Sequence, residues 1–211
     1  MKNDLKLLSN RAEQFYTNLL ALRPVCLADS WALWDATRDP AFNENLLWRQ
    51  PTTPPEVFQR IESILQVVAK NKMGALSVVC PRTGEWIGLM RFFPTRLPNR
   101  ETGLELGVWA HPKYWSSEVT RSLVIMATEI LVTEGSYRMA IIRNAAANPK
   151  ARAICLKLGY SKVGISVAEC EDGTPMPIEL WKVTADEWTM SLGLSHLTNA
   201  ETKAEAELLA A

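Results

Sequence analysis

The strongest hydrophobic pattern in the chain lies over residues 104–131. Leucine and valine first alternate with other residue types as far as Trp109. This period of two predicts a strand whose second face carries one carboxylate, Glu105. After a short polar loop around Pro112, apolar residues recur at helical spacing from about Ser117. The segment therefore predicts a strand, a tight loop and a helix.

Similar patterns predict elements on both sides of this segment. We expect a helix after Leu27 with Asp29 or Ser30 as its N-cap, and helices that begin at Pro54 after Thr53 and at Pro149 after Asn148, because these residue types favour helix starts. Alternating apolar residues and turn signals predict strands over 19–24, 75–80, 85–93, 137–143, 162–169 and 176–183. The proline-rich stretch 39–55 predicts a long irregular connection, in which Trp48 either packs the loop onto the core or lines a substrate site. A polar loop is expected over 94–103.

Composition limits the class of protein. A chain of 211 residues with 47% hydrophobic content can bury one substantial core. We expect one domain over 19–190, a helical extension over 1–18 and an Ala/Glu-rich tail over 191–211. Lysine plus arginine and aspartate plus glutamate both number 23, which argues against nucleic acid as a partner.

Apolar runs and cysteine usage bear on location and cofactors. The apolar runs are too short to span a bilayer, so no membrane partner is expected. The four cysteines are scattered without a CxxC pair and the chain has two histidines, which argues against a metal site and against a disulfide framework. We expect a cytoplasmic protein.

The strand–loop–helix segment has a further property. Such a loop directs its backbone N–H groups at one point, where the positive end of the helix dipole also attracts anions. The geometry is typical of phosphate binding.

Two sequence motifs resemble the GNAT acyltransferases, most closely the branch that acetylates the N-termini of ribosomal proteins. Residues 105–109 read ELGVW and residues 112–122 read PKYWSSEVTRS, where the branch reads approximately ELGYW and P-x-YWGKGYATEA. The frame is kept, but Ser116 and Glu118 replace the two loop glycines. Residues 148–160 resemble the family's N-x-x-S…K-L-G-F motif, with Ala151 in place of serine.

The resemblance covers about residues 19–188, and the order of predicted elements is that of the family. It implies an α/β (α+β) GNAT fold, with a twisted, mixed, mostly antiparallel sheet of six or seven strands and about four flanking helices. It also implies acetyl-CoA as co-substrate.

The resemblance also implies a set of cofactor-binding residues. Backbone groups at Val108 and Trp109 would hold the pantetheine arm and polarise the thioester, and Asn148 would hold the same arm. A helix N-cap is the alternative role of Asn148, and capping also explains the loop serines. The loop and helix start would bind the pyrophosphate through Trp115, Ser116, Ser117, Glu118, Val119, Thr120 and Arg121.

Two residues are candidate catalysts. Glu105, at the position of the family's ELG glutamate, would accept the proton of the acceptor amine, and partial burial would raise its pKa. The alternative is a structural carboxylate paired with an arginine such as Arg91. Cys155 lies where many family members place a tyrosine that protonates the leaving thiolate. The alternative for Cys155 is inert packing.

These motifs predict an acetyl-CoA-dependent N-acetyltransferase that acts by direct attack of a primary amine. The acceptor would be a protein N-terminus or a small amine, and the enzyme could form a homodimer. Residues 39–55 and the closing hairpin would form the acceptor wall. The alternative is a non-catalytic GNAT-fold binding or regulatory protein that binds acetyl-CoA weakly or not at all.

Overall fold

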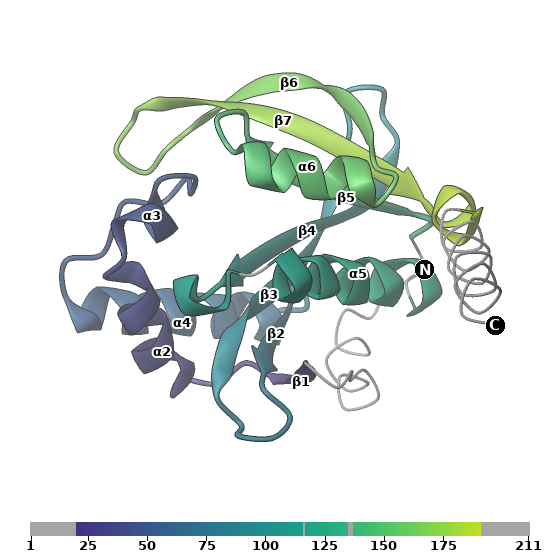
Figure 1. The fold of residues 1–211 in the computed structure, drawn as a ribbon. Coiled ribbons are helices and arrows are strands. Elements are labelled where there is room, and N and C mark those ends of the chain that lie inside the picture. The colour runs from purple at the N-terminus through teal and green to yellow at the C-terminus, as the bar shows by residue number, and fades with distance from the viewer. Residues whose placement is uncertain (1–19, 116, 135–136, 191–211) are drawn as a thin grey trace, which may run out of the picture.

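A seven-stranded sheet forms the centre of the molecule (Figure 1). The computed structural model describes residues 20–115, 117–134 and 137–190, so the expected extension over 1–18 and tail over 191–211 lie outside the described residues. The strands are β1 (Ala21–Pro24), β2 (Gly74–Val79), β3 (Trp86–Arg96), β4 (Thr102–Ala110), β5 (Met139–Ala145), β6 (Ser161–Glu169) and β7 (Pro175–Thr184).

The strand order confirms the expected mixed and mostly antiparallel sheet. Neighbours follow the order β1-β2-β3-β4-β5-β7-β6. Every neighbouring pair is antiparallel except β4 and β5. These two strands are parallel, and the helix Ser117–Glu134 connects them. This one parallel pair is short, and only residues 104–106 of β4 have partners on β5.

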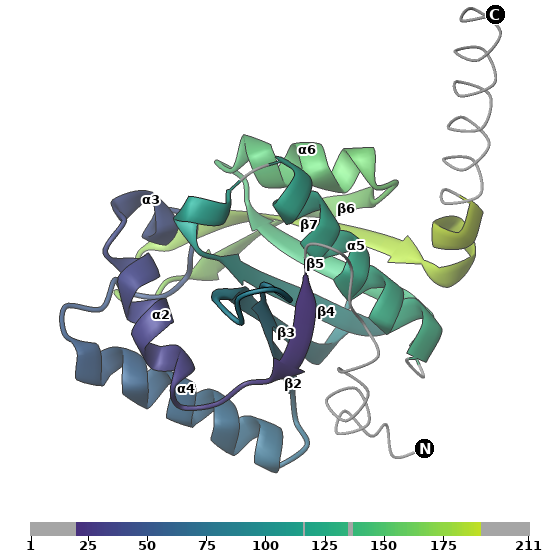
Figure 2. The same cartoon turned by 60° about the horizontal axis from the view of Figure 1, so that its bottom comes forward.

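Helices cover both faces of the sheet (Figure 2). Leu104 and Leu106 of β4 pack in one apolar cluster with residues of α5, whereas Trp109 packs in a second cluster with residues of α2 and α4. The predicted alternation along β4 is therefore confirmed. The helices are α2 (Asp29–Thr37), α3 (Pro40–Asn43), α4 (Pro54–Ala69), α5 (Ser117–Glu134) and α6 (Pro149–Lys157). Residues 185–190 are also helical.

The structure differs from the sequence prediction over residues 94–103. Half of this expected loop belongs to strands, because Pro94, Thr95 and Arg96 of β3 pair with residues 102–104 of β4, and only residues 97–101 connect the two strands. The sequence suggests a loop because proline cannot donate to a ladder. Pro94 is tolerated because β2 pairs with β3 only as far as Phe92, so no strand lies on the second side of Pro94.

The predicted helix starts are partly correct. Asn148 caps α6, since its Oδ1 accepts the N–H of Ala151 at 3.0 Å. Ala28, and not Asp29 or Ser30, is the N-cap of α2, because Asp29 is buried and its carboxylate binds Arg23, Ser77 and the Cys26 N–H. Thr53 is the N-cap of α4 but makes no side-chain cap bond. Before α4 begins at Pro54, the stretch 39–55 contains one helical turn, α3, where an irregular connection was expected.

No helix in the described ranges is long and apolar enough to cross a membrane.

Candidate active site

The strands β4 and β5 separate beyond their short paired segment. Residues 107–110 of β4 pair with β3 on one side but have no partner on β5. The Ala110 carbonyl faces this gap, because it accepts the indole N–H of Trp115 at 2.8 Å instead of a bond from β3. Since hydrogen-bonding directions alternate along an antiparallel strand, the backbone of Val108, two residues earlier, faces the same gap. The backbone groups of Val108 on this side have no partner in the sheet and are available to a bound group.

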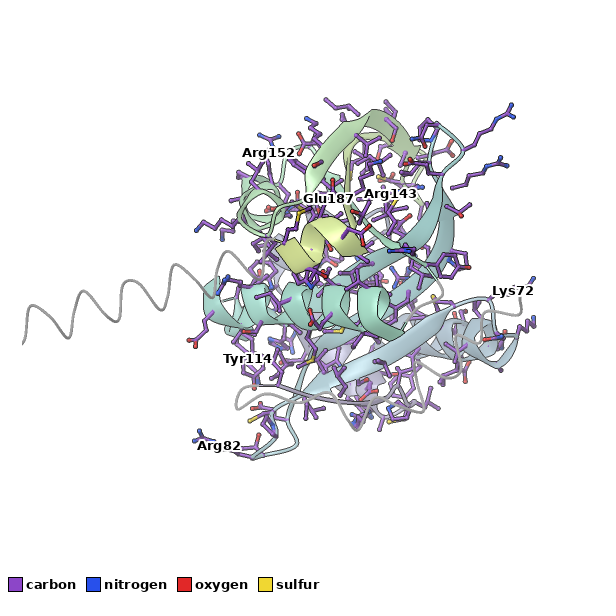
Figure 3. All side chains as sticks on the ribbon, turned by 90° about the vertical axis from the view of Figure 1, so that its right-hand side faces the viewer. Lys72, Arg82, Tyr114, Arg143, Arg152 and Glu187 are labelled. Atoms are coloured by element: carbon purple, nitrogen blue, oxygen red, sulfur yellow. The ribbon has the colours of Figure 1, made fainter. Side chains whose placement is uncertain are left out.

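The loop after β4 leads directly to the start of α5. Residues 112–114 form a 3-10 turn, and α5 begins at Ser117. The loop is fastened on one side, where Tyr114 and Lys113 both bind Glu85 near the β2–β3 turn. Figure 3 places Tyr114 on the side of the molecule that carries Arg82 of this turn. Ser116 lies outside the described residues.

Several charged side chains lie near the N-terminus of α5. Glu118 and Arg121 are both exposed in the first turns of the helix. Lys113, in the loop before the helix, forms an ion pair with Glu85. Lys150 of α6 also comes near, with Nζ 5.8 Å from the centre of the Trp115 ring. Sequence reasoning missed Lys150 because only the fold brings the starts of α5 and α6 together.

Glu105 lies at the point where β4 and β5 begin to separate. Its Oε2 accepts a hydrogen bond from Thr95 Oγ1 at 2.9 Å and forms an ion pair with Arg143 Nε at 3.0 Å. Arg143 follows Ile142, the last residue of β5 that pairs with β4. Burial raises the pKa of the Glu105 carboxyl, although Arg143, Thr95 and Arg91 each act to lower that pKa. Glu105 therefore has an arginine partner, as its structural alternative predicts, but the partner is Arg143 and not Arg91.

Cys155 is a buried residue of α6. Its exposed fraction is 2%, and its thiol accepts the Asn144 side-chain N–H at 3.3 Å. Burial raises the pKa of this thiol to about 11. Burial therefore makes this thiol a weaker acid than an unperturbed cysteine, whose pKa is about 8.5. Its geometry favours packing, and its role as the general acid stays a prediction.

A stack of aromatic and guanidinium groups lies on the face of the sheet that carries Glu105. The Trp48 and Trp109 rings are 4.6 Å apart, and the Arg60 and Arg91 guanidinium groups lie 4.4 Å and 4.2 Å from the centres of the Trp48 and Trp109 rings. Trp48 is 8% exposed and holds the 39–55 segment to the core, as the first of its two expected roles predicts.

The 39–55 segment and the closing hairpin meet beside this stack. Glu171, in the turn between β6 and β7, donates its N–H to the Leu47 carbonyl and accepts the Arg49 N–H. Its carboxylate also binds both terminal nitrogens of Arg60 at 2.9 Å. The two expected parts of the acceptor wall are therefore in direct contact.

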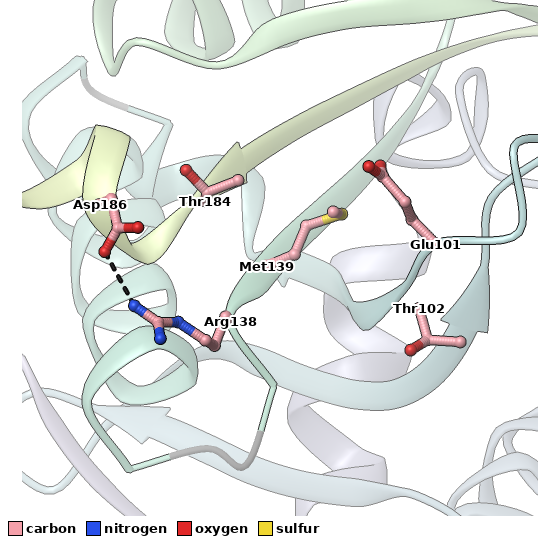
Figure 4. Close-up of a pocket in the computed structure, with 6 residues that line it drawn as sticks. All are labelled: Glu101, Thr102, Arg138, Met139, Thr184 and Asp186. Atoms are coloured by element: carbon pink, nitrogen blue, oxygen red, sulfur yellow. Dashed lines mark hydrogen bonds and ion pairs between the residues drawn. The ribbon is translucent and has the colours of Figure 1, made fainter.

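A shallow cavity lies elsewhere, near the first residues of β4 and β5 and the end of β7 (Figure 4). It is lined by Glu101, Thr102, Arg138, Met139, Thr184 and Asp186. Its ion pair, Arg138 with Asp186, is exposed to solvent. The cavity lies at the paired end of these strands, so it is separate from the gap beyond Leu106. Within the described residues, no group of three or more histidine, cysteine or acidic side chains could hold a metal ion.

A mostly antiparallel sheet with two separated central strands, followed by a loop and a helix, is the arrangement that the resemblance to acyltransferases implies. The model of the acetyltransferase (GNAT) domain matches residues 20–161. The chain therefore belongs to the GNAT acetyltransferase family.

Solved structures with the same fold include RimL, an alpha-N-protein acetyltransferase of a ribosomal protein, in complex with coenzyme A. It has a TM-score of 0.68 and 15% identity, over 81% of this chain and 97% of that chain. Spermidine N-acetyltransferase from Vibrio cholerae, in complex with CoA and spermine, has a TM-score of 0.65 and 15% identity, over 82% of this chain and 99% of that chain. No curated protein matches the sequence.

Proposed function

We propose that this protein transfers an acetyl group from acetyl-CoA to a primary amine, and that Glu105 receives the proton that the amine loses. The observation that carries this proposal is the position of a buried carboxylate with a raised pKa where β4 and β5 separate. Proteins of the same fold acetylate a ribosomal-protein N-terminus or spermidine, according to their names. A protein N-terminus or a small amine is therefore the class of acceptor.

Three features of the chain support the chemistry. The backbone of Val108, with that of Trp109 beside it, would hold the pantetheine arm and polarise the thioester carbonyl, since fixed donors stabilise charge that develops in a transition state. The start of α5 from Trp115 to Arg121, with Lys150, would bind the pyrophosphate. Asn148 fixes the start of α6 near this site. Acetyl-CoA supplies the activated acetyl thioester.

Glu105 is suited to accept a proton. A general base is most effective when its pKa lies near the working pH, and burial moves the pKa of this carboxyl in that direction. Arg143 and Thr95 fix its orientation through Oε2, and no protein hydrogen bond to Oε1 is seen in the described part of the chain. Oε1 would therefore accept the ammonium proton, directly or through a water molecule.

A thermal shift with acetyl-CoA tests the proposal against the non-catalytic alternative. A ligand at a hundred times its Kd adds about 2.7 kcal/mol to the free energy of unfolding. We expect a rise in Tm with acetyl-CoA and with CoA, together with acetyl transfer to at least one amine in a panel of N-terminal peptides and polyamines. Binding without transfer would favour the regulatory alternative, and absence of both would reject the proposed function.

Cys155→Ala is expected to leave kcat within about threefold of wild type and to lower stability by about 1–2 kcal/mol. The physical reason is that a thiol with a pKa of about 11 packs in the core and does not deliver a proton. Chemical denaturation measures the stability, and a steady-state assay measures kcat. A variant that folds normally but has lost activity would restore Cys155 as the general acid.

The expectation of a homodimer stays a prediction, which light scattering of the purified protein would test.

A further inference from the structure

Arg91 is a cation left without a partner in the stack beside Glu105. The two other arginines of this region form ion pairs, Arg60 with Glu171 and Arg143 with Glu105. Among the described residues, no hydrogen bond or ion pair to the Arg91 guanidinium is found, and Glu105 influences it only through space. Its guanidinium lies 4.2 Å from the centre of the Trp109 ring, which attracts a cation through its π-electrons.

The stack also contains buried donors that have no acceptor. Arg91 Nε, Arg60 Nε and Trp48 Nε1 are buried and lack a hydrogen-bond partner. Buried polar atoms are almost always paired, so each exception calls for an explanation. All three atoms can only donate hydrogen bonds. The complementary group is therefore a hydrogen-bond acceptor, and a carboxylate or a phosphate would also match the positive charge of Arg91.

The position of the Arg91 guanidinium relates it to the proposed reaction. A Cβ atom added to Gly107 would lie 3.6 Å and 3.7 Å from its NH2 and Nε atoms, so the guanidinium occupies the space above this glycine. Gly107 lies two residues beyond Glu105 on the same face of β4, which is roughly 7 Å along a strand. An anion bound by Arg91 would thus lie within a few bonds of an amine at Glu105.

We propose that Arg91, stacked on Trp109, selects acceptors that carry an anionic group, a carboxylate or a phosphate, close to the amine that is acetylated. The inference rests on the proposed acetyl transfer and names the chemical class of its acceptor. The guanidinium presents a planar fork of donors that matches a carboxylate or phosphate, and such charge-assisted bonds are the strong ones. Burial and the nearby Arg60 lower the pKa of Arg91 to about 10, so the group remains charged at neutral pH.

Two matched pairs of acceptors test the inference. The first pair is the peptide amides Ala-Asp-Ala and Ala-Asn-Ala, and the second is phosphoethanolamine and ethanolamine. Each pair differs in one anionic group, and the pairs separate a peptide acceptor from a small phosphorylated one. We expect the anionic member of at least one pair to have a kcat/KM at least tenfold higher with the wild-type protein.

The variants Arg91→Gln and Arg91→Lys locate the source of this preference. We expect Arg91→Gln to bring the ratio within the preferred pair close to one, and Arg91→Lys, which keeps the charge without the fork, to give an intermediate ratio. Arg138→Gln is the matched control, because it removes an exposed guanidinium whose side chain is 80% accessible and lies outside the site. It should keep the wild-type ratio. Circular dichroism shows that each variant is folded.

A binding measurement separates failure of the inference from failure of the proposed function. The Ala-Asp-Ala amide and phosphoethanolamine are titrated into each protein while the fluorescence of its tryptophans is recorded. If no acceptor is acetylated, the proposed function fails, but binding that Arg91→Gln abolishes still supports an anion site. The inference is overturned if the wild-type protein neither prefers nor binds the anionic members, or if Arg91→Gln keeps the preference or the binding.

Discussion

Replacing Glu105 with glutamine is expected to lower kcat/KM by about 10²-fold or more while leaving the affinity for acetyl-CoA nearly unchanged. Glutamine keeps the shape of the side chain but cannot accept a proton from the ammonium group. The base acts only when it is deprotonated, and the pKa of this carboxyl is raised by burial. Activity of the wild-type protein should therefore fall as the pH drops through the raised pKa, and this acidic limb should flatten in the variant.

The pH dependence of stability gives an independent readout of the same carboxyl. The folded chain holds the Glu105 proton more tightly than the unfolded chain does, so this residue lowers stability as the pH rises through its folded pKa. Glu105→Gln should remove this contribution, and its Tm at neutral pH should not fall below that of wild type by more than a few degrees.

A matched carboxylate completes the test of Glu105. Glu101→Gln makes the same change at an exposed carboxylate that pairs with Lys182 just before β4, and we expect its kcat/KM to stay within twofold of wild type. If Glu105→Gln stays within a few-fold of wild type with its acidic limb intact, Glu105 is not the base and its bonds to Thr95 and Arg143 are structural.

The fold was largely predictable because local patterns decide it. Alternation identified β4 and its two faces, and Asn148 with Pro149 identified the start of α6, where the amide caps the helix as expected. The ends of β3 and β4 were not predictable, because Pro94 is a strong local signal for a loop. Pro94 can lie in a strand only because β2 does not extend beside it, so no neighbouring strand needs its missing N–H group.

Candidate site residues could be named from the sequence, but their contacts could not. Glu105 could be selected from its place on the strand, whereas its partners Thr95 and Arg143 depend on the register of β3 and on the separation of β5. In the same way, the ion pair of Lys113 with Glu85 depends on the fold, which brings the β2–β3 turn to the loop. Long-range contacts of this kind leave no periodic signal in a single sequence.

The stack of tryptophans and arginines was missed for the same reason. Arg60, Trp48, Trp109 and Arg91 come from four separate segments, and no spacing relates them. The one available signal was Gly107, since a glycine beside a carboxylate on a strand face leaves space for a large neighbour. The structure shows that Arg91 fills that space.

Glu118→Gly is expected to tighten acetyl-CoA binding by several-fold to about a hundredfold, which corresponds to about 1–3 kcal/mol. Glu118 is exposed in the first turn of α5. The branch of the family that this sequence resembles has glycine at this position. A carboxylate there occupies the positive end of the helix dipole and repels the pyrophosphate. Lys113 cannot offset this charge because it is paired with Glu85, which leaves Arg121 and Lys150 to do so.

The same substitution should slightly lower the Tm of the protein without ligand. An acidic residue at a helix N-terminus contributes about 0.3–1 kcal/mol, and glycine adds backbone entropy to the unfolded chain. Opposite effects on the empty and the bound protein would show that Glu118 stabilises the helix end at the expense of the ligand.

Glu118→Gln separates the two causes of the expected gain in affinity. Glutamine removes the charge but keeps the restricted backbone, so an improvement shared by both variants reports repulsion, and an improvement found only with glycine reports backbone freedom. Calorimetric titration with acetyl-CoA measures both variants and the wild type. Tight binding by the wild type that neither variant improves would mean that the loop holds the pyrophosphate away from residue 118. In that case the exposed carboxylate points to solvent and leaves the positive end of α5 to the ligand.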